Sequence, residues 1–130
     1  MKYMLMMNVV GKAPYSISTW AKKDVDAHLA FLRQFNRKLS ESGEFVAVEG
    51  LTHPDRAKLI QAGDERTPIT DGVFPEAKEF LAGYWIVDVE SEEEAIKIAA
   101  RASLAPAPAG TPGTMPLEVR QVMSGPPKDL

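Results

Sequence analysis

The clearest secondary-structure signals lie in the stretch Leu81-Ala-Gly-Tyr-Trp-Ile-Val-Asp-Val-Glu-Ser-Glu-Glu-Glu-Ala95. Its part from Gly83 to Val89 is short and rich in aromatic and β-branched residues, which is typical of a β-strand. Ser91 then precedes three glutamates in a capping-box pattern that places acidic groups at the positive end of a helix dipole. The stretch therefore predicts a strand followed by a helix. The small and apolar residues that allow this helix to pack closely on a sheet are Ala95, Ile98, Ala99 and Ala102.

Upstream of this stretch, periodic apolar residues predict another helix from about Thr19 to Ser42. The residues that recur at spacings of three and four are Val25, His28, Leu29, Leu32, Phe35 and Leu39. Gly43 follows and supplies the left-handed conformation that ends many helices. Because His28 shares the apolar face, its imidazole is expected to point toward the core rather than into water.

Strand-like runs bounded by turn-forming residues surround the two helices. They are Tyr3 to Val10, Glu44 to Leu51, Ala57 to Gln61, Gly83 to Val89 and Leu117 to Met123, of which Ala57 to Gln61 is the weakest. The order β-α-β-β-turn-β-α-β predicts an α+β sandwich of the ferredoxin-like βαββαβ type, with an antiparallel sheet and both helices on one face. We expect apolar residues such as Trp85 or Tyr84 on the other face, where a second copy would cover them in a homodimer.

Composition excludes several classes of function. The 130 residues are 45% hydrophobic and are expected to form a single domain, 1–130, with a long proline-rich loop at 104–116. The lack of cysteine removes thiol chemistry and favours a reducing, cytoplasmic location. The net charge of -3, without a basic run, argues against nucleic acid as a partner. No stretch approaches the roughly 20 apolar residues of a membrane span, so no membrane association is expected.

Motifs for nucleotide and metal chemistry are not found in the sequence. It contains no dinucleotide-binding glycine motif, no phosphate-binding loop and no Gly-x-Ser-x-Gly elbow. With His28 and His53 as the only imidazoles, a zinc site would depend on carboxylates at unsuitable spacing. We therefore expect neither a metal nor a cofactor. His53 precedes Pro54 in an expected turn and is predicted to be exposed to solvent.

A further set of motifs resembles those of a known family. They are Asp71-Gly-Val-Phe74, Glu76, Lys78-Glu79, Gly83-Tyr84, Glu94-Ala95 and Glu118-Val-Arg120, together with His28-Leu29 and Gly50-Leu51. In these motifs the chain resembles YCII-related proteins of the DGPF-domain group, although Val73 and Gln121 stand where the family usually has proline. The resemblance implies a dimeric α+β barrel and an active-cleft histidine, which His28 matches. It implies an aspartate whose nearest counterpart is Glu41, too far along the helix to reach His28 within one chain.

Three residues are candidates for chemistry. His28 carries an inward imidazole that can exchange a proton near neutrality, although a core histidine satisfied by a backbone carbonyl has the same pattern. Asp71 lies in an expected loop near a cleft, although Asp-Gly is also a favoured turn dipeptide. Arg120 has a donor fork that suits a carboxylate or phosphate, although Glu118 on the same strand face can neutralise it. We predict His28 and Asp71 as catalytic residues and Arg120 as a substrate-binding residue.

The sequence leaves more than one function open. The first is a cofactor-independent isomerase or lyase in which His28 moves a proton on a small organic substrate, for which an anion is one option. Analogy with related dimeric barrels favours this reaction class. The alternative is a small-molecule-binding or regulatory accessory module, because DGPF-type proteins resemble partners encoded beside alternative sigma factors. A plainer interpretation is a dimer whose cleft is closed by side chains.

Overall fold

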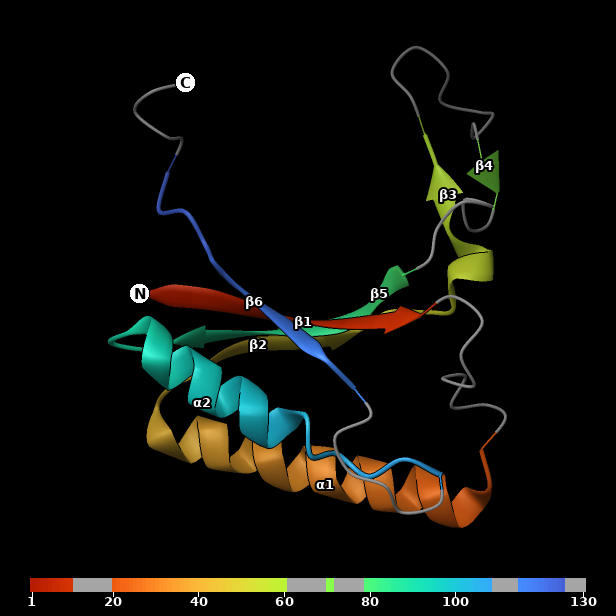
Figure 1. Ribbon diagram of the computed structural model, residues 1–130, viewed down its shortest axis with the longest axis horizontal. Helices are drawn as coiled ribbons and strands as arrows, with labels where there is room; N and C mark the ends of the chain where they lie inside the picture. Colours follow the sequence, from red (N-terminus) through yellow and green to blue (C-terminus); the bar gives the residue numbers. More distant parts are fainter. Residues whose placement is uncertain (11–19, 61–69, 72–78, 109–114, 126–130) are drawn as a thin grey trace.

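The structure is a computed structural model that describes residues 1–10, 20–60, 70–71, 79–108 and 115–125. Within these ranges, a four-stranded sheet is covered on one face by two α-helices, and a two-stranded sheet projects away from the helices (Figure 1). The elements are β1 (Lys2–Val10), α1 (Lys22–Ser42), β2 (Phe45–Gly50), the 3-10 turn η2 (Pro54–Arg56), β3 (Lys58–Leu59), β4 (Thr70–Asp71), β5 (Glu79–Asp88), α2 (Glu92–Ala102) and β6 (Leu117–Gln121).

The strand order of the larger sheet is β2-β5-β1-β6, and each neighbouring pair is antiparallel. Helix α1 connects β1 to β2, and α2 connects β5 to β6, so each helix crosses over one intervening strand. This arrangement confirms the predicted α+β fold and is consistent with the ferredoxin-like type. The weakest predicted strand, Ala57 to Gln61, contributes only β3, which pairs with β4 outside the main sheet.

Both predicted helix termini are confirmed by their capping contacts. Gly43 ends α1 with a left-handed φ of 79°, and its backbone N–H donates to the Ser40 carbonyl. At the start of α2, the Ser91 hydroxyl accepts the backbone N–H of Glu94 at 3.3 Å. These caps fix where each helix leaves its neighbouring strand, which in turn sets the residues that face the sheet.

The core lies between the helices and the sheet. Alternation along β1 directs Tyr3, Leu5 and Met7 toward the helices, where all three are buried. The other largely buried core residues are Phe35, Leu39, Trp85, Val87, Val89, Ala95, Ile98, Ala99, Ala102, Ala105 and Met115. Three of the four alanines of α2, namely Ala95, Ala99 and Ala102, are buried and give its inner face a thin layer of side chains, so the helix backbone can lie close to the sheet.

The expectation for Trp85 was wrong. Trp85 pairs with Leu5 across the strands, lies on the helix-covered face and is only 2% exposed. Its neighbour Tyr84 points to the opposite face, because side chains alternate along a strand. There Tyr84 is half-buried, as are three further apolar residues on that face: Met4, Met6 and Ile86. The open face therefore has an apolar centre to which Tyr84 contributes and Trp85 does not, while Glu118 and Arg120 lie opposite Met6 and Met4 on the same face.

Neither helix among the described residues is long and apolar enough to cross a lipid bilayer.

Candidate functional site

A pocket of about 440 Å³ lies where the first half of α1 faces the end of β2 and the strand β5. Its volume falls in the range of about 300–1,000 Å³ that is common for small-molecule sites. Most of its wall is apolar, and its polar side chains come from separate elements. We call it the His28 pocket; residues that line it include His28, Leu32, Asn36, Val48, His53 and Trp85.

His28 is the buried polar residue of this pocket. It is 2% exposed, and its Nδ1 lies 2.9 Å from the carbonyl oxygen of Pro106. A carbonyl oxygen can only accept, so Nδ1 must carry the proton and donate. In the neutral ring the lone pair is then on Nε2, which is the arrangement of a general base. Trp20 packs edge-on against the imidazole, with 5.3 Å between the ring centroids.

The partner of His28 belongs to the proline-rich loop at 104–116, of which residues 104–108 and 115–116 are described. Ala105 and Ala107 on either side of Pro106 are buried, with exposures of 1% and 7%. This part of the loop is therefore packed against the molecule, and its backbone carbonyl holds the imidazole in one orientation. The predicted inward direction of His28 is confirmed.

In another part of the pocket wall, a hydrogen bond joins Asn36 and Trp85. The indole N–H of Trp85 donates to the Asn36 Oδ1 at 2.8 Å, which links β5 to α1. The Asn36 amide group also carries two N–H donors, and such donors can stabilise an oxygen that gains negative charge. Trp85 is held further by Phe35, whose ring meets it edge-on at 5.6 Å.

Gly83 allows β2 and β5 to approach closely beside the pocket. A Cβ atom at this position would lie 2.8 Å from the backbone oxygen of Glu49 and 3.3 Å from the Cα of Gly50. Neither contact can be relieved by rotating a side chain, since both involve backbone atoms. Gly50, which pairs with Gly83 across the strands, has open space at the corresponding position.

His53 is a pocket residue that the sequence interpretation missed. It is exposed, as predicted, with 52% of its side chain accessible, but it also lines the His28 pocket. The residue caps the turn η2, where its Nδ1 lies 3.0 Å from Asp55 Oδ1. Its ring packs edge-on against Phe80, with 6.1 Å between the ring centroids. The His-Pro-Asp turn was visible in the sequence, but its position next to β5 depends on how the chain leaves β2.

Arg120 and Glu41 are not among the described residues that line this pocket, and the Asp71 side chain lies outside what the structure describes. The backbone of Asp71 lies in β4, paired with Lys58, rather than in the predicted loop. Arg120 is exposed on β6 opposite Met4, a position that faces away from the helices. Glu41 is exposed in the last turn of α1.

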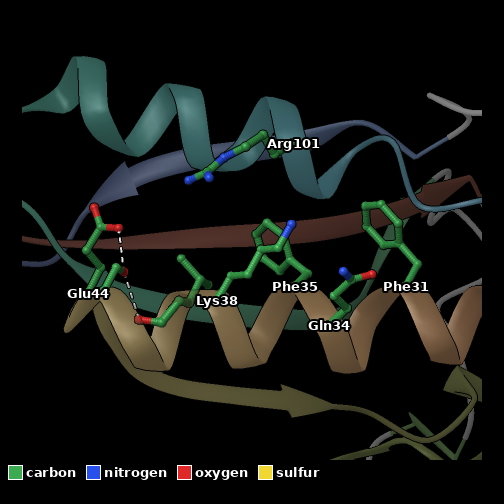
Figure 2. Close-up of a pocket in the computed structure, with 8 residues that line it drawn as sticks. Phe31, Gln34, Phe35, Lys38, Glu44 and Arg101 are labelled. Atoms are coloured by element: carbon green, nitrogen blue, oxygen red, sulfur yellow. Dashed lines mark hydrogen bonds between the residues drawn. The ribbon is translucent and has the colours of Figure 1, made fainter.

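A second hollow of about 150 Å³ lies between α1 and α2, and Figure 2 shows it from the side. Arg101 extends from α2 above it, while Phe31 and Phe35 rise from α1 (Figure 2). At one end, Glu44 accepts a hydrogen bond from the Ser42 hydroxyl at 2.7 Å. We call this hollow the helix groove; its lining includes Phe31, Gln34, Phe35, Lys38, Glu44 and Arg101.

Within the described ranges, no group of three or more histidine, aspartate or glutamate side chains is arranged to hold a metal ion.

Comparison with known proteins assigns the chain to a family. The family model for the YCII-related domain matches residues 1–115, which include every element that lines the His28 pocket. The chain belongs to the YCII-related family. An uncharacterised protein of Rhizobium meliloti (strain 1021) is 30% identical to it over 113 residues, which make up 87% of each chain. That YCII-related relative carries no assigned reaction, so the chemistry has to be argued from the pocket.

Proposed function

We propose that this YCII-related protein binds a small organic molecule in the His28 pocket and transfers a proton on it without a cofactor, as an isomerase or a lyase. The observation that carries the proposal is a buried imidazole that lines a ligand-sized pocket and is fixed as a donor to the Pro106 carbonyl. A core histidine would also be buried with a backbone carbonyl as partner, so the support for a general base comes from the position of the ring in the wall of a ligand-sized pocket.

In this mechanism Nε2 of His28 removes a proton from a C–H or O–H group of the substrate. The imidazolium that results keeps its Nδ1–H bond to Pro106, and this bond becomes stronger because the donor is now charged. In an isomerase, Nε2 returns the proton to another atom of the substrate. In a lyase, the electron pair of the broken C–H or O–H bond forms a new double bond. The bond to the leaving group then breaks, its electron pair departs with that group, and the imidazolium gives the group the proton.

Two residues supply the remaining roles in this proposal. The Asn36 amide donates to the oxygen on which negative charge develops. Asp71 is retained from the sequence as a candidate second acid or base, so Asp71→Asn is a useful companion variant. Arg120 faces away from the pocket of its own protomer, and its predicted role in substrate binding therefore requires a second copy of the chain.

The open face of the sheet supports a homodimer. Tyr84, Met4, Met6 and Ile86 place an apolar surface there, and no described element of the same chain covers it. A second copy that presents the same face would remove both surfaces from water. Sedimentation equilibrium tests this point: a dimer is expected for the native chain, and Met6→Glu should shift it toward monomer.

The proton transfer is tested by deuterium exchange. The protein is incubated in D₂O with a library of small ketones, hydroxy compounds and lactones, and deuterium incorporation is followed by NMR. His28→Gln should abolish exchange on any substrate found while leaving the melting temperature nearly unchanged. Arg101→Gln, which alters the helix groove, serves as the control and should exchange at the native rate. A fully active His28→Gln protein would exclude the mechanism.

The apolar wall of the His28 pocket also favours the alternative, a binding or regulatory module. In that case a small molecule would bind saturably without exchange of its protons. The two functions are separated by measuring binding and exchange on the same molecule. Binding that survives His28→Gln, with no exchange by the native protein, would favour the module.

A further inference from the structure

We infer that the His28 pocket selects uncharged molecules with an apolar body and a hydroxyl or carbonyl group, and that it discriminates against carboxylates and phosphates. This inference rests on the proposed function and specifies its substrate class. The sequence left an anionic substrate open, and this inference excludes it. Within one protomer, Arg120 therefore binds no ligand of the His28 pocket.

The charges around the pocket favour an uncharged ligand. Among the described residues that line it, none is lysine or arginine, and Glu49 is the only one with a full charge. The rest of the wall is largely apolar, with Leu32, Val48 and Phe80 as examples. A carboxylate that leaves water for such a surface loses its hydration and meets no opposite charge, so its transfer is unfavourable.

The two imidazoles do not replace the missing cation. His28 already donates its Nδ1–H to Pro106, so this N–H is not available to a carboxylate in the pocket. His53 lies 3.0 Å from the Asp55 carboxylate, which offsets any positive charge that His53 gains. The pocket therefore has no fixed positive group in its described lining.

Three described cations lie outside this lining. Lys38 and Arg101 line the helix groove on another side of α1, and Arg120 is exposed on the sheet face that points away from the helices. What the His28 pocket does present is neutral hydrogen-bonding groups, since Asn36 and Thr52 are among its lining residues. Amides and hydroxyls of this kind suit an alcohol or a carbonyl group.

Two matched probes test this preference: 3-phenylpropan-1-ol and 3-phenylpropanoate, which have the same ring and number of carbon atoms. Binding is followed through the indole N–H signal of Trp85 in ¹⁵N-labelled protein, since Trp85 lines the pocket. The alcohol should bind at least about tenfold more tightly, because only the carboxylate must be dehydrated without a partner. Equal or tighter binding of 3-phenylpropanoate would overturn the inference.

A pair of variants separates local charge from net charge. Leu29 lines the pocket, whereas the adjacent Ala30 is exposed and does not, so Leu29→Lys and Ala30→Lys add the same charge to α1 at different places. Leu29→Lys should tighten binding of 3-phenylpropanoate at least about fivefold, because a cation at the pocket edge attracts it. Ala30→Lys should leave that binding unchanged.

The outcomes distinguish the inference from the proposed function. If Ala30→Lys gives the same gain as Leu29→Lys, net charge governs the preference and the inference fails. If the carboxylate binds best, the substrate class is wrong while proton transfer by His28 stands. If neither probe moves the Trp85 signal, the pocket takes no such ligand, and both the inference and the proposed function are contradicted.

Discussion

Helix α1 lines two hollows that differ in the kind of polar group they contain. The His28 pocket has a volume of about 440 Å³, a buried imidazole and one fully charged residue, Glu49, in its described lining. The helix groove has a volume of about 150 Å³ and carries Lys38, Glu44 and Arg101. Exposed charges at a shallow groove remain solvated and contribute little, whereas burial of a polar group has a cost that the surroundings must offset. The buried imidazole, rather than the number of charged residues, therefore distinguishes the His28 pocket from the helix groove as the candidate site.

The largest expected effect on stability concerns the wall that the pocket shares with the core. Trp85→Ala should lower the free energy of unfolding by about 3–5 kcal/mol, because it leaves a cavity and removes the partner of Asn36. Phe31→Ala, in the helix groove, should cost at most about 2 kcal/mol, since Phe31 is only half-buried. Urea unfolding measures both. A Trp85→Ala loss no greater than that of Phe31→Ala would contradict the packing described for the pocket.

The second effect concerns activity. His28→Gln should reduce proton exchange on a turned-over substrate by at least about 100-fold, which is the typical contribution of a general base. The double variant Lys38→Gln/Arg101→Gln should retain the native exchange rate, because the proposed mechanism uses no residue of the helix groove. Initial rates in D₂O test the pair. If the double variant lost proton exchange while His28→Gln retained it, the reaction would take place in the helix groove and not in the His28 pocket.

The third effect concerns the closeness of β2 and β5. Gly83→Ala should destabilise the fold by about 1–3 kcal/mol, since its Cβ would meet backbone atoms of Glu49 and Gly50. Gly50→Ala is the matched control and should stay within about 0.5 kcal/mol of the native protein. Thermal and urea unfolding provide the comparison. Equal costs at the two glycines would show that the close approach is not required.

The smallest effect is expected in the helix groove. Lys38→Gln and Arg101→Gln, alone or together, should change the free energy of unfolding by no more than about 0.5 kcal/mol, because exposed charges are screened by water and salt. Neither change should alter binding of 3-phenylpropan-1-ol, followed through the Trp85 indole signal. A clear effect on that binding would mean that the two hollows are coupled through α1.

Much of the fold could be predicted from the sequence because its signals are local. The spacing of apolar residues identified α1 and the inward side of His28, and Gly43 and Ser91 identified helix termini that the structure confirms. Trp85 was placed on the wrong face because Tyr84-Trp85 is an apolar pair, and alternation alone does not say which member faces the helices. The register with Leu5 decides that point, and register is a long-range property.

The candidate site depended even more on long-range contacts. Pro106 is 78 positions from His28, and the sequence indicated only that it belonged to a loop. His53 follows a strand whose neighbour in space, β5, begins with Glu79 much later in the chain. Such contacts leave no periodic pattern, so the sequence could nominate His28 but not the residues that surround it.

The most direct test of the role of His28 is the state of its imidazole, measured by long-range ¹H–¹⁵N correlation with and without 3-phenylpropan-1-ol. The Pro106 contact predicts a ring protonated at Nδ1, with an Nε2 signal that shifts as the probe fills the pocket. A ring protonated at Nε2 instead, or an Nε2 signal that does not respond to a probe that shifts Trp85, would contradict His28 as the base of this pocket.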